Sequence, residues 1–255
     1  MTNLLSQEIV HSSPVPSAND ARSNNVLMLH AVAEAMGDIR ESVVFLGGAV
    51  LPHLLTDELA RFVRPAKDVD FIIDFSKKED LLNFEDTLWE RGFQKVRNGA
   101  VSSWILGRIR IDALPGDPEV LTFNNQWCGE AMHYSQRIQI GDDLWVNAIS
   151  APYYLGTKLN AFDRRGFGNF SASKDIFDIL LIFAGHEAIE TEIKHRTSCV
   201  FIAFLRDKLE RIRTGSDNFH RVAARGFQTE ALLKRHLPEA ISRIQKVIDL
   251  TLEHR

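Results

Sequence analysis

Cysteine is scarce in this chain. Only Cys128 and Cys199 occur among 255 residues, so the sequence excludes a disulfide framework and offers no cysteine spacing of the kind that binds zinc. We expect both thiols to be buried or idle in a reducing cytoplasm.

Long apolar runs are also missing. No segment approaches the roughly 20 residues that a membrane-spanning helix needs. Residues 1–20 lack both the basic start and the apolar stretch of a secretory signal. Because residues 1–24 are rich in Ser, Asn and Pro, we interpret them as a mobile arm.

What is present is typical of a globular protein. Hydrophobic residues make up 45% and charged residues 25%, and the length allows one large or two small domains. The net charge of −4 is uneven, since residues 196–255 carry 12 Lys and Arg against 7 Asp and Glu, a local +5 that leaves −9 for the rest. This basic region could meet a polyanion such as RNA, or it could simply supply the solvated faces of amphipathic helices.

The period of the hydrophobic pattern divides the chain near Ile149. Before it, short alternating runs predict strands between helices, and after Ser150-Ala151-Pro152 only helical spacing remains. This predicts an α+β fold, with an α/β half around a mixed sheet followed by an all-helical half. Strands are expected at 43–46, 68–73, 101–106, 108–112, 137–140 and 144–149, and helices at 26–36, 50–62, 80–91, 151–162, 173–183, 201–212 and 237–248.

The stretch from Val43 to Asp74 contains the strongest functional signal. A short apolar strand ends in Gly47-Gly48, and a later strand opens with Asp68 and Asp70. Aspartate is a poor strand residue, and such conflicts with local propensity gather at functional sites. Residues two apart in a strand share a face, so the two carboxylates repel unless a divalent cation compensates them.

A third acid strengthens this signal. The alternation in residues 108–112 places Arg108, Arg110 and Asp112 on one face of another strand. Three carboxylates can hold Mg²⁺ (or Mn²⁺) against a triphosphate. Glycines at a strand-to-helix turn let a phosphate approach backbone N–H groups. Each part is common by itself, and only the combination is specific.

Charged residues in the helical half have two interpretations each. Lys158 lies at the edge of an apolar helical stripe, where it can reach a phosphate or extend its stem along the surface toward water. Asp175 and Asp178 share a helix face. Asp175 could act as a base or position Lys158, or both acids could merely complement the helix dipole.

Three segments carry a family resemblance. LGGAVLPHLL…RPAKDVDFII, RIRIDALP and APYYLGTKLNAF…GFGNFSASKDIFDIL resemble the nucleotidyltransferase superfamily, which has the DNA polymerase β-like fold. Within it they are similar to the AbiEii/MenA-like proteins, many of them toxins of toxin–antitoxin or phage-defence pairs. The resemblance covers about residues 26–185.

The resemblance implies roles for particular residues. It implies a nucleotidyltransferase-like domain at 25–149, followed by a helical domain at 150–255. Two departures from the family pattern are Ala49, where many members have Ser, and Ala66, where relatives commonly have Thr. The implied metal ligands are Asp68, Asp70 and Asp112. The implied nucleotide-binding residues are Gly47, Gly48, Arg64, Lys67 and Lys158. The implied catalytic residues are the three metal ligands together with Lys158 and Asp175.

The function expected from this resemblance is metal-dependent transfer of a nucleoside monophosphate from an NTP to an acceptor hydroxyl, with release of pyrophosphate. The acceptor could be RNA, with tRNA favoured by family analogy, or a protein or small-molecule hydroxyl. If the chain is a toxin, its partner would be an antitoxin protein. The alternative is a non-catalytic nucleotide- or RNA-binding protein that keeps the fold, which Ala49 and Ala66 suggest and the clustered acids argue against.

Overall fold

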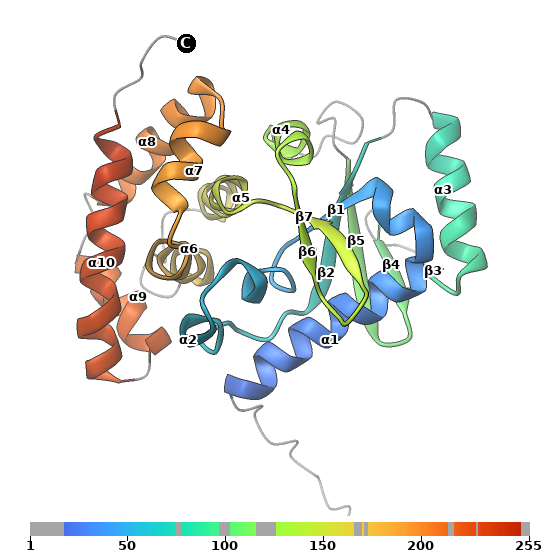
Figure 1. The fold of residues 1–255 in the computed structure, drawn as a ribbon, viewed down its shortest axis with the longest axis horizontal. Helices are drawn as coiled ribbons and strands as arrows, with labels where there is room; N and C mark the ends of the chain where they lie inside the picture. Colours follow the sequence, from blue (N-terminus) through green and yellow to red (C-terminus); the bar gives the residue numbers. More distant parts are fainter. Residues whose placement is uncertain are drawn as a thin grey trace, which may run out of the picture.

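A computed structural model describes residues 18–74, 78–96, 103–115, 126–165, 170, 173–213, 217–227 and 229–250. Within these ranges seven strands form one mixed sheet, in the order β3-β4-β5-β2-β1-β7-β6 (Figure 1). The predicted α+β fold is therefore confirmed. The strands are β1 (Val43–Leu46), β2 (Asp68–Ile73), β3 (Gln94–Lys95), β4 (Ser103–Leu106), β5 (Ile109–Pro115), β6 (Gln136–Gln139) and β7 (Trp145–Ala148).

Strand β2 lies at the centre of the sheet. It pairs with β1 in antiparallel register and with β5 in parallel register. Its odd positions Val69 and Phe71 are fully buried, whereas Asp68 and Asp70 are partly exposed on the other face. The alternation that predicted this strand is thus present, and it points the two acids away from the core.

The first helix, α1 (Ala18–Met36), begins earlier than the sequence indicated. The prediction of a mobile arm is wrong for residues 18–24, because the helix runs through these positions and Ala21 is buried in the core. The rest of the predicted arm, residues 1–17, lies outside the described residues. Helix α1 then continues into the 3₁₀ turn η1 (Gly37–Ser42).

The single helix expected at 50–62 is also wrong. The structure has a 3₁₀ turn, η2 (Leu51–Leu54), and a short helix, α2 (Asp57–Ala60), separated by extended backbone at Leu55 and Thr56. The Thr56 N–H donates a hydrogen bond to the Gly185 carbonyl, at 3.0 Å. This contact with a distant helix satisfies the backbone at the break, so tertiary packing overrides the local period.

Helix α3 (Lys78–Glu90) and the short α4 (Cys128–His133) complete the sheet-bearing half. Helix α3 ends at Glu90, two residues before Gly92, whose φ of 87° prevents the helix from continuing. Strands β6 and β7 pair in antiparallel register, where strands were expected at 137–140 and 144–149. Residues 101–102, at the start of the strand expected at 101–106, lie outside the described residues.

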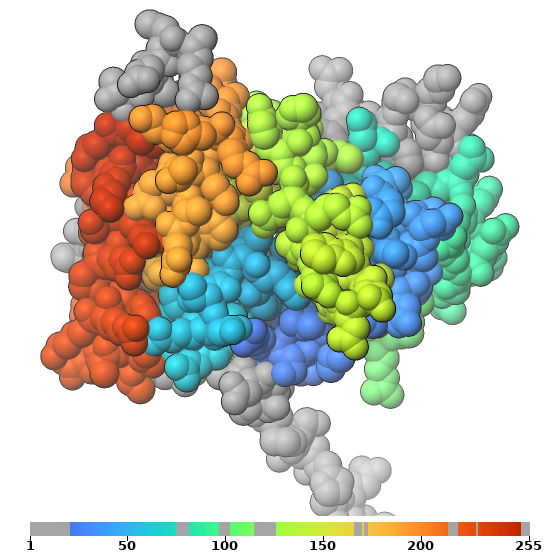
Figure 2. All heavy atoms as spheres, viewed as in Figure 1, coloured from blue at the N-terminus to red at the C-terminus, as the bar shows by residue number. Residues whose placement is uncertain are grey.

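Every described element after β7 is a helix. Helix α6 is central: residues 175–185 are all buried, and α5, α9, α10 and α2 pack around it. Figure 2 shows the last helices, in orange and red, forming one side of the molecule beside the sheet-bearing half. The helices are α5 (Ala151–Arg164), α6 (Lys174–Gly185), α7 (Ile189–Arg196), α8 (Cys199–Arg213), α9 (Asp217–Phe227) and α10 (Glu230–Ile248), of which α7 and α9 were not predicted.

Among the described helices, none is long and apolar enough to cross a membrane.

Candidate functional site

Three acids gather on neighbouring strands. The parallel register of β2 and β5 places Asp70 directly opposite Asp112, while Asp68 lies two residues along on the same face of β2. One carboxylate oxygen from each of the three lies within 4.8 Å of the others. The sequence placed Asp68 and Asp70 together, and the sheet adds Asp112 as expected.

Their electrostatics are unfavourable without a cation. Burial raises the pKa of Asp70 to about 7, and the charges of Asp68 and Asp112 add to this effect. Burial and Asp112 also raise the pKa of Asp68, although Arg110 and Lys158 oppose the rise. The three carboxylates repel one another when all are ionised, and a divalent cation would relieve this repulsion. Their hard oxygen atoms are suitable ligands for Mg²⁺ or Mn²⁺.

Neighbouring side chains orient Asp112. The Ser103 hydroxyl, buried on β4, donates a hydrogen bond of 2.6 Å to Asp112 Oδ1. Arg110 on the same strand approaches this carboxylate at 3.3 Å. Ser103 was not identified from the sequence, because its place opposite Asp112 depends on the pairing of β4 with β5.

The Gly47-Gly48 turn lies against these acids. Gly47 has a φ of +79°, which side chains rarely adopt, and a Cβ atom there would lie 2.2 Å from Asp70 Oδ2. A Cβ on Gly48 would lie 3.2 Å from the Ala66 Cβ. The turn therefore needs glycine both for its backbone and for its close approach to the carboxylate cluster.

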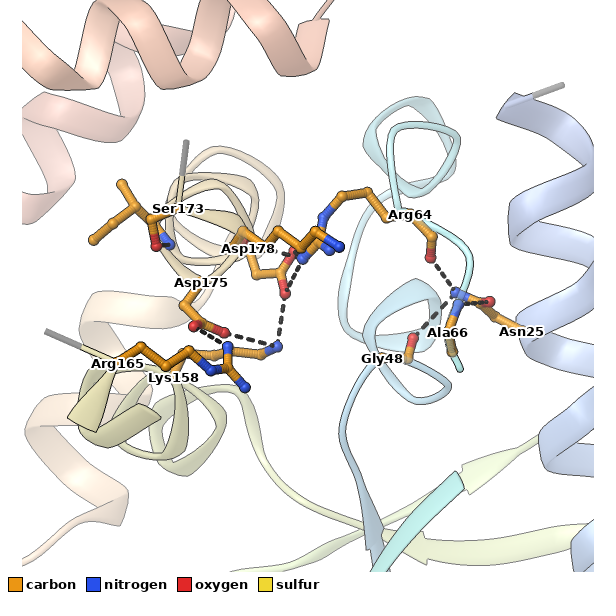
Figure 3. A network of polar contacts seen from close by, with 11 residues as sticks. Asn25, Gly48, Arg64, Ala66, Lys158, Arg165, Ser173, Asp175 and Asp178 are labelled. Atoms are coloured by element: carbon orange, nitrogen blue, oxygen red, sulfur yellow. Dashed lines mark hydrogen bonds and ion pairs between the residues drawn. The ribbon is translucent and has the colours of Figure 1, made fainter. Parts of the chain in front are cut away.

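A second charged network lies in the helical half. Lys158 Nζ on α5 lies 2.7 Å from Asp178 Oδ2 and 3.6 Å from Asp175 Oδ1 (Figure 3). Asp178 accepts two hydrogen bonds from Arg64, each of 2.9 Å. Asp175 also forms an ion pair with Arg165.

The two acids of this network are buried, so their charges depend on the cations beside them. The side chains of Asp175 and Asp178 are 5% and 3% exposed. Burial alone would lower the pKa of Lys158, but Tyr154, Asp178 and Asp175 outweigh it and raise that pKa above its usual value. Complementing the helix dipole is therefore not the whole role of these two acids.

Lys158 connects the two charged groups. Besides its ion pairs on α6, its charge opposes the rise in the pKa values of both Asp68 and Asp70. The structure thus brings the predicted lysine into the electrostatic field of the predicted metal ligands, although they belong to different halves of the chain.

Lys67 and Arg64, two of the three charged residues expected to bind the nucleotide, differ in their surroundings. Lys67 is exposed beside Asp68. Arg64, in contrast, uses its guanidinium to bind Asp178 and the Lys174 carbonyl. In this structure Arg64 is a bridge from the loop before β2 to α6.

One residue at the turn was missed from the sequence. Asn25 on α1 is fully buried and hydrogen-bonds to Gly48, Arg64 and Ala66. Its position at the edge of a polar N-terminal stretch gave no sign of this role. The fold alone brings Asn25 next to residues 48, 64 and 66, which are distant in sequence.

The basic surplus of the C-terminal region is largely used within the protein. Among the described residues of this region, seven cations form ion pairs with carboxylates, and four of these cations reach acids outside the region. The seven are Lys208, Arg211, Arg213, Lys234, Arg235, Arg243 and Lys246. The charge count alone therefore overstates the positive surface offered to a polyanion.

No protein-family model and no curated protein matches the sequence. Among solved structures, the chain is similar to an antigenic nucleotidyltransferase-like protein from Paracoccidioides brasiliensis, with a TM-score of 0.51 and 14% identity. The similarity covers 81% of this chain and 98% of the other. At this identity it shows a shared, nucleotidyltransferase-like fold and nothing further.

Proposed function

We propose that this protein is a metal-dependent nucleotidyltransferase, which moves a nucleoside monophosphate from an NTP to an acceptor hydroxyl and releases pyrophosphate. The observation that carries the proposal is the cluster of Asp68, Asp70 and Asp112 directly against the Gly47-Gly48 turn. Neither feature alone is specific. Together they would provide a cation site and, directly beside it, a turn that can bind phosphate.

The three acids would hold the metal. Bound Mg²⁺ or Mn²⁺ would lower the pKa of the attacking hydroxyl and neutralise charge on the leaving pyrophosphate. Because Asp70 and Asp112 are paired across two central strands, their separation is fixed by the sheet rather than by a loop. Asp112 is further oriented by Ser103.

The glycine turn and Lys158 would bind the phosphates. Backbone N–H groups at Gly47 and Gly48 can approach an anion closely because neither residue has a side chain. Lys158 adds a cation on the side of the helical half, and Lys67 adds an exposed one. Asp175, which is buried and paired with Lys158 and Arg165, suits the positioning of Lys158 better than the role of a base.

The acceptor is proposed by analogy. RNA, with tRNA first, is the favoured class, and a protein or small-molecule hydroxyl is the next. A toxin role with an antitoxin partner, and a division into domains at 25–149 and 150–255, belong to the same proposal. The rival is a non-catalytic protein that binds metal and nucleotide or RNA without turnover.

The test is incubation with Mg²⁺, total cellular RNA and each α-³²P-labelled NTP in turn, beside the Asp68→Ala/Asp70→Ala double variant. Label that moves onto tRNA-sized RNA with the wild type alone would support transfer to RNA. Label on the protein itself would support protein nucleotidylation. Absence of transfer to every acceptor, despite metal binding, would reject the enzyme in favour of the non-catalytic rival.

A further inference from the structure

We propose that Asn25 is a positioning residue of the nucleotide site, holding the Gly47-Gly48 turn and the loop at 64–66 in one arrangement. The inference rests on the proposed function. It adds a residue from α1 that lies outside the strands and helices which carry the acids and Lys158.

The side-chain amide of Asn25 uses both of its ends. Its Nδ2 donates to the Gly48 carbonyl at 3.2 Å and to the Arg64 carbonyl at 2.8 Å. Its Oδ1 accepts from the Ala66 N–H at 2.7 Å (Figure 3). The amide therefore joins two backbone segments that approach each other closely, the turn after β1 and the loop before β2.

Only a residue with both a donor and an acceptor at this distance can make these contacts. Aspartate has the shape of Asn25 but no donor, and its charge would face two carbonyl oxygens. Alanine would leave the Ala66 N–H and two carbonyls without this partner. Because Asn25 is fully buried, water cannot readily replace the lost bonds.

The position within the helix is itself unusual. Asn25 lies well inside α1, and asparagine is unfavourable in helix interiors because its side chain competes for backbone hydrogen bonds. A fully buried polar residue there lowers the intrinsic stability of the helix. Its three tertiary hydrogen bonds supply the compensation, and all three go to segments of the proposed site.

The two segments matter for different parts of the proposed nucleotide. Gly48 belongs to the phosphate turn, and Ala66 precedes the metal ligand Asp68 by two residues. Arg64 extends the connection, since its carbonyl is held by Asn25 while its guanidinium binds Asp178, the partner of Lys158. Asn25 thus connects the turn on one side of the site to the cation on the other.

The experiment compares Asn25→Asp and Asn25→Ala with the wild type in the nucleotide-transfer assay, with Asn147→Ala as the matched control. Asn147 also donates an amide hydrogen bond to a backbone carbonyl, that of Glu41 at 2.9 Å, but it lies on β7, which is adjacent to neither of the strands that carry the acids. We expect the KM for NTP to rise at least about tenfold in both Asn25 variants, with kcat within about threefold of wild type. Asn147→Ala should change neither.

This split separates positioning from a merely structural role. Partial unfolding would lower the active fraction, and so kcat, without a selective rise in KM. Asn25→Ser is the further variant if the first two do not fold. An unchanged KM, or a fall in kcat alone, in variants of an active wild type would overturn this inference and leave the proposed function standing. A wild type that transfers no nucleotide would overturn both.

Discussion

Replacing Asp70 with Asn should make the metal-free protein more stable at alkaline pH. Asp70 has a pKa of about 7 in the folded protein, raised from 3.8 first by burial and then by its acidic neighbours. When it ionises without a cation, the folded state alone bears the cost. The amide that replaces the carboxyl group keeps its shape and carries no charge.

The magnitude follows from the difference between the folded and unfolded pKa values. Between about pH 4 and pH 7 the folded state binds more protons at this position than the unfolded chain does, so the free energy of unfolding falls as pH rises. A tenfold change in acidity corresponds to about 1.4 kcal/mol, which gives a full cost of roughly 4 kcal/mol above pH 7. Allowing for poorer packing of the amide, we expect Asp70→Asn to gain about 2–4 kcal/mol at pH 8 and about 1 kcal/mol or less at pH 4.5.

The assay is urea unfolding in EDTA across this pH range, with Asp74→Asn as the control. Asp74 follows the same strand but is exposed and outside the cluster, so its replacement should have little effect at either pH. Mg²⁺ or Mn²⁺ should then stabilise the wild type and not Asp70→Asn. A variant less stable than wild type at pH 8, or a gain that does not depend on pH, would refute the reasoning.

Two further predictions concern backbone and buried charge. Gly47→Ala should lower the free energy of unfolding by about 1–3 kcal/mol more than Gly92→Ala does, and it should abolish stabilisation by Mn²⁺ in thermal unfolding. Both glycines have positive φ, but only a Cβ at Gly47 would meet a carboxylate. Equal losses of stability in the two variants would contradict this. Asp178→Ala should lower the free energy of unfolding, measured in urea, by about 3–5 kcal/mol, because it leaves Lys158 and Arg64 without their shared buried partner. The control Glu210→Gln, which breaks an exposed ion pair, should have no measurable effect. A small effect of Asp178→Ala would show that the network is dispensable for stability.

The pairing of Asp68 with Asp70 could be predicted because its signal is local. Two aspartates at alternate positions of an apolar strand share a face whatever the rest of the fold does. The contact of Asp70 with Asp112 is different, since it depends on parallel pairing between strands that are not neighbours in sequence. The alternation around Asp112 indicated its face, and the register became visible only in the structure.

The structural features that the sequence did not predict have a common physical cause. Asn25 and the break at Leu55–Thr56 are both determined by partners far along the chain, and neither leaves a mark on local composition or period. A polar stretch that supplies one buried amide has the same composition as a mobile arm. The contact of Arg64 with Asp178, 114 residues away, likewise leaves no sign in the sequence around Arg64.

In the proposed reaction, the protein uses the acid cluster to transfer the α-phosphoryl group of the NTP, together with its nucleoside, to the acceptor. The most direct measurement compares α-³²P- and γ-³²P-labelled NTP in parallel reactions with Mg²⁺ and the accepting RNA or protein, for wild type and Asp112→Asn. The account predicts that α label enters the acceptor, that γ label leaves as pyrophosphate, and that Asp112→Asn does neither. Entry of γ label into the acceptor, or undiminished transfer by Asp112→Asn, would contradict it.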